Sequence, residues 1–270
     1  MGETRQFGAE GRVTLTMTGS GVAEVVLARG DKMNALDPAM FEALIAAGHA
    51  LFDMSGLRCV VLSGEGRAFC AGLDMASMAA LGGGEGAITD RTHGNANHFQ
   101  QVALQWRKLP VPVIAAIHGV CFGGGLQIAC GADVRVVHPE ARLSVMEMKW
   151  GIVPDMAGYV LWKGTVRDDV LRELTYTNRE FSGAEAQVLG FATLVDADPR
   201  ARAAAIAADI AARNPHAIRA AKRLFGRYLG EDERAILMAE SVEQHALVGS
   251  RNQVEAVRAQ MERRAPDFAD

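Results

Sequence analysis

Short apolar runs that end in small or polar residues constrain the fold of this chain more than any other sequence feature. Residues 59–62 and 111–117 are apolar without polar alternation, as in strands buried on both faces, and residues 133–137 have the length of a third such strand. Helical patterns in residues 40–52 and 97–109 separate these runs. Short strands with helices between them predict an α/β core that is built by successive crossovers.

The chain begins with a different pattern. Residues 12–18 and 22–28 are rich in apolar and β-branched residues, and the intervening residues 19–21 (GSG) favour a turn in which glycine supplies positive φ angles. Asp37 and Pro38 then provide an N-cap and a first-turn proline. The sequence therefore predicts a hairpin followed by a helix.

The last quarter of the chain has the composition of helices only. Alanine, glutamate, arginine and leucine dominate residues 201–270, with helix breaks at residues 214–215 (NP) and at Gly230. We expect residues 231–264 to be helical without a further break. The predicted organisation is a core in residues 1–200 and a helical region in residues 201–270.

Composition and charge argue against several classes of protein. Of the 270 residues, 49% are hydrophobic and 22% are charged, as in an ordinary globular protein with a large core. The formal net charge of −4 argues against a nucleic-acid partner, because phosphate backbones are bound by basic surfaces. No apolar run reaches the ~18 residues of a membrane span, and the first ten residues do not resemble a secretory signal. We therefore expect a cytoplasmic protein that has no membrane partner.

Two patterns that can indicate a metal or a cofactor lack the context they need. The four cysteines form no C-x-x-C pair and have no histidines at ligand spacing, so we expect buried thiols and no metal. Residues 82–87 match G-x-G-x-x-A, but no apolar strand leads into them, so we expect no dinucleotide site. They belong to a polar stretch, residues 81–97, for which we expect a mobile loop that shapes a pocket.

A first segment with chemical information follows the strand expected at residues 59–62. Ala71 and Gly72 are small enough to let a ligand approach the backbone, and their turn could leave the amide of Leu73 without a partner. Ligands favour the carboxyl ends of strands in α/β sheets, and a free amide can stabilise an oxyanion. The alternative is an ordinary turn from a strand into a helix.

A second segment again leads from a buried strand into glycines. Gly123, Gly124 and Gly125 precede an expected helix start, so their amides and the positive end of the helix dipole would face a negative or developing charge. The alternative is that these glycines only allow tight helix packing.

A third segment, residues 144–158, places the carboxylates of Glu147 and Asp155 among mainly apolar residues. Burial raises the pKa of a carboxyl group, and a carboxyl nearer neutrality can take up and return a proton. The alternatives are two charges satisfied by arginine or backbone amides and, for Asp155, a cap on a helix that begins near Met156.

Together these three segments resemble the crotonase (enoyl-CoA hydratase/isomerase) family over roughly residues 12–265. In that family an A-G-x-D turn and a G-G-G turn supply two backbone amides for a thioester oxygen, and the matching amides here belong to Leu73 and Gly124. Residues 31–36 (DKMNAL) and 151–154 (GIVP) also resemble family segments, the former beside coenzyme A. The resemblance implies an acyl-CoA substrate and an enolate intermediate.

The resemblance also implies a fold, an assembly and a set of CoA contacts. The family fold is a spiral of β-β-α turns with a C-terminal helical region that packs trimers, often paired into hexamers. No separate cofactor is implied, because coenzyme A arrives as part of the substrate. The matching CoA-binding positions are Lys32, Ala68, Ala71 and Asp74, together with Arg263 in a tail that reaches a neighbouring subunit.

The chain departs from the family pattern at one position. Hydratases of the family use two glutamates, whereas this chain has Gln127 and Glu147, and an amide can hold a water but cannot accept its proton. Glu147 then acts alone or with Asp155, which lies eight residues later (155 − 147), the offset at which the family's dienoyl-CoA isomerases place a second carboxylate. Because one base is sufficient to move a double bond, the departure favours isomerisation over hydration of a 2-enoyl-CoA.

Two other functions stay open from the sequence. An acyl-CoA thioester hydrolase could use Glu147, although the chain contains no G-x-S-x-G motif for a nucleophilic serine. A catalytically degenerate acyl-CoA-binding protein would account for Gln127. Turnover of acyl-CoA esters separates the enzymes from the binding protein.

Overall fold

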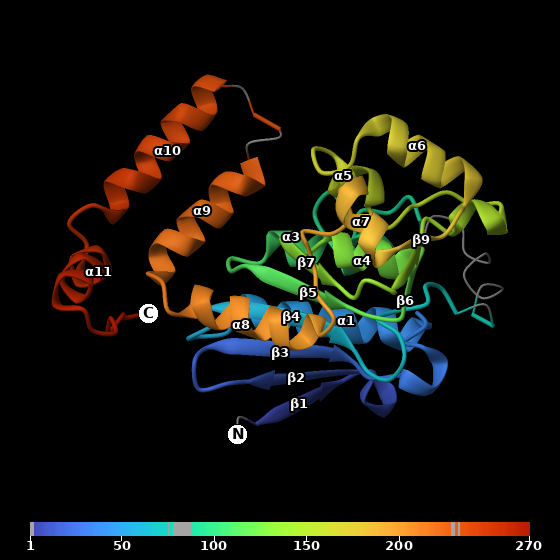
Figure 1. Cartoon of the computed structure of the whole chain (residues 1–270), viewed down its shortest axis with the longest axis horizontal. Coiled ribbons are helices and arrows are strands. Elements are labelled where there is room, and N and C mark those ends of the chain that lie inside the picture. The colour runs from blue at the N-terminus through green and yellow to red at the C-terminus, as the bar shows by residue number, and fades with distance from the viewer. Residues whose placement is uncertain (1–2, 75, 78–87, 228–229, 232) are drawn as a thin grey trace.

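The computed structural model describes residues 3–74, 76–77, 88–227, 230–231 and 233–270. Its helices and strands alternate as the apolar runs predict (Figure 1). The strands are β1 (Thr4–Phe7), β2 (Val13–Met17), β3 (Val22–Leu27), β4 (Cys59–Gly64), β5 (Val113–Ile117), β6 (Val120–Phe122), β7 (Val134–Val137), β8 (Arg142–Ser144), β9 (Phe181–Ser182) and β10 (Leu194–Val195). The α-helices are α1 (Pro38–Phe52), α3 (His98–Lys108), α4 (Gly124–Cys130), α5 (Gly158–Trp162), α6 (Asp168–Thr177), α7 (Gly183–Leu189), α8 (Pro199–Ala211), α9 (Pro215–Arg227), α10 (Glu233–Leu247) and α11 (Arg251–Glu262). The described residues also form the 3₁₀ helices η1 (Ala9–Gly11), η2 (Gly30–Lys32) and η3 (Glu147–Trp150).

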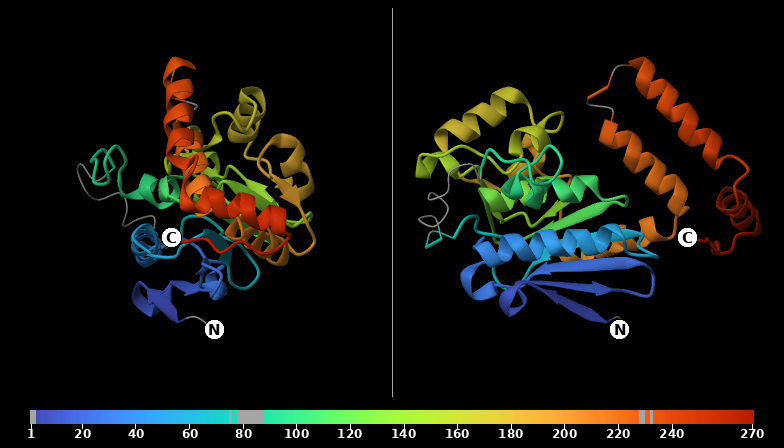
Figure 2. Two further views of the ribbon diagram at one scale, coloured as in Figure 1. Left: turned by 90° about the vertical axis from the view of Figure 1, so that its left-hand side faces the viewer. Right: turned by 180° about the vertical axis from the view of Figure 1, so that it is seen from behind.

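A seven-stranded sheet forms the centre of the molecule, in the order β1-β2-β3-β4-β5-β7-β10. β1, β2 and β3 pair antiparallel, and the remaining neighbours in this sheet, in the order β3-β4-β5-β7-β10, pair parallel. Figures 1 and 2 show α1 and α8 on opposite faces of this sheet. Val60 and Leu62 accordingly belong to the core on the α1 side, and Cys59 and Val61 to the core on the α8 side. Burial of both faces explains why these strands are apolar without alternation.

Most predicted elements are confirmed. The hairpin of β2 and β3 has the predicted turn between them, and α1 begins after Asp37, whose side chain accepts a hydrogen bond from the Met40 amide. α3 begins with a capping box, in which Asn97 and Gln100 each accept a hydrogen bond from the other's backbone amide. Local capping chemistry therefore sets the starts of the two helices that cover one face of the sheet.

Two elements differ from the sequence-based predictions. β1 was not predicted, because it is an exposed edge strand and its residues TRQF carry no apolar alternation. Residues 231–264, predicted as one helix, form α10 and α11 instead. Gly249 takes a φ of +76°, and the Ser250 side chain caps α11 by accepting a hydrogen bond from the Gln253 amide.

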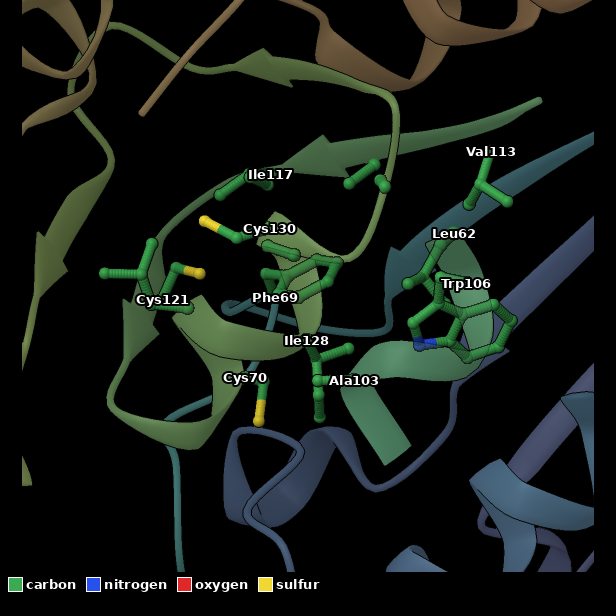
Figure 3. Close-up of a cluster of buried hydrophobic side chains, with 14 of the residues drawn as sticks. Leu62, Phe69, Cys70, Ala103, Trp106, Val113, Ile117, Cys121, Ile128 and Cys130 are labelled. Atoms are coloured by element: carbon green, nitrogen blue, oxygen red, sulfur yellow. The ribbon is translucent and has the colours of Figure 1, made fainter. Parts of the chain in front are cut away.

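A smaller sheet and a buried helix lie above the central sheet and carry the turns of the site. β6 pairs parallel with β8, and β8 pairs antiparallel with β9. β6 leads directly into α4, and every residue of α4 is buried. Figure 3 shows Ile128 and Cys130 of this helix in the same apolar cluster as Phe69, Cys70 and Cys121. A rigid core therefore supports the turn at the start of α4.

The C-terminal helices differ in how they contact the core. α8 packs on the sheet through the buried Ala203 and Ala207, whereas α9 to α11 extend away from it (Figures 1 and 2). Lys222 anchors α9 to the core through an ion pair with Asp133, with 2.5 Å between Nζ and Oδ2. The predicted division between residues 200 and 201 falls within α8 and stays a prediction. Across the described ranges, no helix has the length and apolarity that a membrane span requires.

Candidate active site

A pocket of about 920 Å³ lies where the turns after β4 and β6 meet the segment after β8. This volume is in the range of small-molecule sites. Much of its wall is apolar, formed by Phe41, Leu73, Ile88, Phe99, Phe122, Met146, Trp150, Ile152, Val153 and Met156. Its charged and amide side chains are Gln127, Arg142, Glu147, Lys149, Asp155 and Glu180. The pocket therefore gathers all three segments that the sequence indicated.

The turn after β4 presents the backbone of Leu73 to this pocket. Gly72 has a φ of +88°, and a Cβ atom there would lie 2.8 Å from the Phe122 carbonyl oxygen, so only glycine fits. The Leu36 amide donates to the Gly72 carbonyl (2.8 Å), and the Asp74 amide donates to the Leu36 carbonyl (3.0 Å). These two bonds fix the residue between them, and the Leu73 amide has no acceptor among the residues that the structure describes.

The turn after β6 brings a second amide to the same place. Gly123 has a φ of +52°, and Gly124 is the first residue of α4. A Cβ atom on Gly72 would lie 3.7 Å from the Gly124 nitrogen, so the two turns are in contact. A Cβ atom on Gly124 itself would lie 2.7 Å from Met156 Sδ and 2.9 Å from Leu36 Cδ1. Within the described ranges, the Gly124 amide also has no hydrogen-bond acceptor.

Glu147, at the start of η3, is buried and lines the pocket. Its Oε1 accepts a hydrogen bond of 2.6 Å from Gln127 Nε2, while its Oε2 has no partner in the described part of the chain. Burial raises the pKa of Glu147, and the charge of Asp155 raises it further, although the hydrogen bond from Gln127 acts in the opposite direction. The carboxyl group is therefore suited to take up a proton and return it.

Gln127 of α4 is held in one orientation by the backbone. Its Oε1 accepts hydrogen bonds from the Met156 and Gly158 amides, each 2.9 Å long. Because the carbonyl side faces two donors, the amide nitrogen must face Glu147. Gln127 and Glu147, which belong to two different sequence segments, therefore lie side by side.

Asp155 lies on the open side of the pocket, near enough to Glu147 for its charge to act on that carboxyl. The helix α5 begins at Gly158, with Ala157 as its N-cap and with no side-chain cap, so Asp155 does not cap it. Desolvation by the surrounding protein raises the pKa of Asp155 although its side chain is exposed. The third segment thus brings two carboxyls of raised pKa into one pocket.

The residues expected to bind CoA are more dispersed. Ala71 lines the pocket, whereas Lys32, Ala68 and Asp74 are not part of the lining just described. Asp74 forms an ion pair with Arg29, 2.6 Å between Oδ2 and Nη1, which together with the nearby charge of Lys32 holds its pKa below its usual range. Ala68 is fully buried.

Arg263 follows α11 at the far end of the C-terminal helices, away from α4 and the pocket (Figure 1). Within one chain it therefore cannot take part in the site. All five CoA-binding assignments stay predictions.

The sequence marked residues 31–36 by their resemblance to a family segment but predicted no role for Asn34, which joins this segment to the turn after β4. Asn34 has a φ of +55° and is fully buried, and its Nδ2 donates to the carbonyls of Glu65 (2.9 Å), Ala68 (2.9 Å) and Phe69 (3.2 Å). Its Oδ1 accepts from the Arg29 amide (2.9 Å). The available signal was an asparagine in a turn, a residue that tolerates positive φ and bonds neighbouring backbone.

The cysteines are free and buried, as expected: Cys59, Cys70, Cys121 and Cys130. Burial raises the pKa of Cys59 and of Cys70 to about 12. Among the described residues, no group of three or more His, Cys, Asp or Glu side chains has the arrangement of a metal site. Residues 82–87, which match a dinucleotide pattern, and the first part of the loop expected at residues 81–97 lie outside the described residues.

The sequence is similar to known proteins over nearly its whole length. The family model described as enoyl-CoA hydratase/isomerase matches residues 17–270. The mitochondrial Delta(3,5)-Delta(2,4)-dienoyl-CoA isomerase of Rattus norvegicus is 30% identical over 263 residues, which is 93% of this chain and 80% of that protein. The enoyl-CoA hydratase EchA19 of Mycobacterium tuberculosis is 28% identical over 246 residues, covering 90% and 91% of the two chains.

The fold is also similar to that of solved structures. An enoyl-CoA hydratase from Bacillus anthracis superimposes with a TM-score of 0.86 at 26% identity, over 95% of this chain and 98% of that one. The α/β fold with a central sheet and C-terminal helices is the one that the three sequence segments imply.

Proposed function

Because the chain belongs to the enoyl-CoA hydratase/isomerase (crotonase) family, we propose that it moves double bonds in an acyl-CoA thioester through an enolate. One observation carries the proposal: Glu147 is buried, one carboxylate oxygen is held by the Gln127 amide, and the other has no partner in the described residues. Family membership supports an enzyme of this class, and the reaction itself depends on the side chains of the site.

In this proposal the amides of Leu73 and Gly124 bind the thioester oxygen. Both belong to pocket-lining residues on turns that touch, and neither has an acceptor within the described ranges. Such donors act more strongly on the enolate than on the neutral thioester, and the loss of one typically raises the barrier by ~3 kcal/mol. Stabilisation of the enolate, which every reaction through this intermediate shares, is therefore assigned to backbone amides and not to side chains.

We assign the proton transfer at the α carbon to Glu147. A Cβ atom on Gly123 would lie 3.4 Å from Glu147 Oε1, and the next residue, Gly124, carries the proposed oxyanion donor. The α carbon is bonded to the thioester carbonyl, so a carbonyl held at Gly124 brings that carbon close to the carboxyl group. The raised pKa of Glu147 narrows the difference in pKa between this base and the weakly acidic α carbon.

The Gln127 side chain favours isomerisation over hydration. Hydration requires a group that takes a proton from the attacking water and a second group that delivers a proton to the α carbon, and the neutral amide of Gln127 can serve as neither. Moving a double bond requires one base that removes a proton and returns it to another carbon. Glu147, which accepts a hydrogen bond from Gln127, can act as this single base.

Asp155 supports a dienoyl-CoA as the substrate. Two double bonds move together when one carboxyl removes a proton and another delivers one farther along the chain. Glu147 and Asp155 line the same pocket and interact electrostatically, and dienoyl-CoA isomerases are among the relatives of this chain. We therefore propose 3,5-dienoyl-CoA to 2,4-dienoyl-CoA isomerisation as the main reaction.

Binding of the CoA portion and assembly belong to the same proposal. We assign Lys32, Ala68, Ala71 and Asp74 to the CoA of their own subunit and Arg263 to that of a neighbour in a homotrimer, or in a hexamer of two trimers. Apolar side chains exposed on α10 and α11 support association through these helices: Leu237, Met238, Val242, Val254, Val257 and Met261.

The test is turnover of 3-enoyl-, 3,5-dienoyl- and 2-enoyl-CoA esters, with release of free CoA measured in parallel. Dienoyl isomerisation faster than hydration is the expected result. Hydration as the faster reaction overturns the assignment of Gln127. Free CoA without a shifted double bond indicates a thioester hydrolase, and tight binding without any turnover indicates an acyl-CoA-binding protein.

A further inference from the structure

We propose that Cys70 is a positioning residue that sets the spacing between the Leu73 and Gly124 amides. The inference rests on the proposed function, because this spacing matters only if both amides bind one thioester oxygen. Cys70 does not line the pocket and is fully buried, so it acts through its neighbours.

The thiol of Cys70 is bonded to the first turn and to the segment behind it. Its Sγ accepts a hydrogen bond from the Gly72 amide (3.5 Å) and donates one to the Asn34 carbonyl oxygen (3.1 Å). Asn34 is in turn fixed by hydrogen bonds between its side chain and the loop that leads into Cys70. The sulfur therefore links a rigid anchor to the residue directly before Leu73.

The same residue is pressed against the second turn. The Cys70 amide donates to the Val120 carbonyl (3.1 Å), and the Phe122 amide donates to the Cys70 carbonyl (3.0 Å). A Cβ atom on Gly125 would lie 2.5 Å from the Cys70 carbonyl oxygen and 2.9 Å from Cys70 Sγ. The glycine after Gly124 thus packs against Cys70 through its carbonyl oxygen, its Cβ and its sulfur, so that this one residue contacts both turns.

The chemistry of the Cys70 thiol is consistent with a positioning role and not with a reactive one. Burial raises the pKa of Cys70 to about 12, so the group stays protonated and keeps its S–H donor at neutral pH. Figure 3 shows its sulfur pointing away from Cys121 and Cys130, toward a blue N-terminal segment. A protonated thiol without solvent access is neither a nucleophile nor a proton shuttle.

Cys130 provides a matched control. It is buried in the same cluster and lies at the other end of α4. Cys130→Ala therefore removes an equally buried thiol without touching either turn. Thermal melting of both variants establishes that each is folded at the assay temperature.

The experiment compares the wild type with Cys70→Ala, Cys70→Ser and Cys130→Ala. Isomerisation gives kcat and KM, and the carbonyl stretch of bound octanoyl-CoA, labelled with ¹³C at the thioester carbon, reports how strongly the amides polarise the carbonyl. For Cys70→Ala we expect kcat to fall ~10- to 100-fold with a smaller change in KM, since misplaced catalytic groups cost rate more than affinity. In Cys70→Ala the shift of the carbonyl stretch on binding should decrease in parallel with kcat. Cys70→Ser keeps the donor to Asn34, so we expect it to restore most of kcat and most of the carbonyl shift.

Each outcome has one meaning. An unchanged kcat and carbonyl shift in Cys70→Ala overturn the positioning role, as does an equal loss of kcat in Cys130→Ala. A wild-type protein that neither shifts the carbonyl of bound octanoyl-CoA nor turns over a dienoyl-CoA contradicts the proposed function itself. A wild type that does both while Cys70→Ala matches it contradicts only the inference about Cys70.

Discussion

The pocket has two walls that are built in different ways. On one wall the proposed functional groups are the backbone amides of Leu73 and Gly124, and close packing of two glycine turns holds them in place. On the other wall they are the side chains of Gln127, Glu147 and Asp155, two of which are joined by a hydrogen bond. In the proposed function the backbone wall binds any thioester enolate, whereas the side-chain wall determines where protons are removed and delivered.

The two walls should respond differently to substitution. An exchanged side chain leaves a backbone amide in place unless the new residue is proline or forces the turn open. A carboxyl is lost with a single exchange of its side chain. Substitutions on the first wall should therefore affect all reactions together, and those on the second should separate them.

Glu147→Gln tests the side-chain wall most strongly. We expect exchange of the substrate's α proton to fall ~10³-fold or more, since the variant keeps the shape and removes the base. Acyl-CoA affinity should stay close to that of the wild type. Deuterium incorporation from D₂O, followed by NMR, measures the exchange, and an unaltered rate would assign the base to another group.

Gly124→Pro against Gly124→Ala tests the backbone wall. Proline at the first position of a helix has a compatible φ but carries no N–H, so we expect ~10²- to 10³-fold slower turnover of every substrate. Alanine keeps the N–H and introduces the same close contact with Met156 and Leu36, so the ratio of the two rates isolates the amide. Equal rates for both variants would argue against an oxyanion role.

Asp155→Asn should separate the reactions. Dienoyl-CoA isomerisation is expected to fall more than ~100-fold, because its second proton transfer loses a carboxyl, while 3-enoyl-CoA isomerisation falls ~10-fold, about 1.4 kcal/mol of barrier. Both rates are measured on one preparation. Similar losses in both would mean that Asp155 acts only on the electrostatics of the site.

Gln127→Glu should produce a modest gain of hydratase activity. The new carboxylate keeps one oxygen on the Met156 and Gly158 amides and can share a water with Glu147 through the other. Two adjacent carboxyls must then hold one proton between them, which limits the gain. Hydration of 2-enoyl-CoA is followed by loss of its absorbance, and an unchanged rate would show that position 127 does not select the reaction.

The smallest expected effect concerns stability. Burial raises the pKa of Glu147 above its ordinary value of 4.5, so its contribution to folding is fully present below pH 4.5 and is lost as pH rises through the folded-state pKa. At pH 7 Glu147 therefore contributes less to the stability of the fold than it does in acid, and Glu147→Gln, which does not titrate, should melt at a higher temperature than the wild type. The difference should vanish in acid, and a variant that melts lower at pH 7 would contradict the burial of the charge.

Sequence patterns predicted much of the fold because the signals are local. Continuous apolar runs mark β4 and β5, whose faces are both covered, and Asp37 and Asn97 cap the two helices that cover one side. The polar edge strand β1 and the break between α10 and α11 escaped prediction, because an exposed strand needs no apolar pattern and one glycine is a weak helix signal.

For the site, the sequence by itself determined which chemical groups are available: two glycine turns, an amide at 127, and carboxyls at 147 and 155. Only the tertiary structure decided their relations. It placed the Gln127 nitrogen on Glu147 by giving its oxygen two backbone donors, and it put Cys70 between the turns. The hydrogen bonds from Gln127 to Glu147, from the Met156 and Gly158 amides to Gln127, and from Cys70 to Asn34 join residues that are 20 or more positions apart in the sequence. Whether such residues meet depends on the packing of the whole core, which no local sequence pattern encodes.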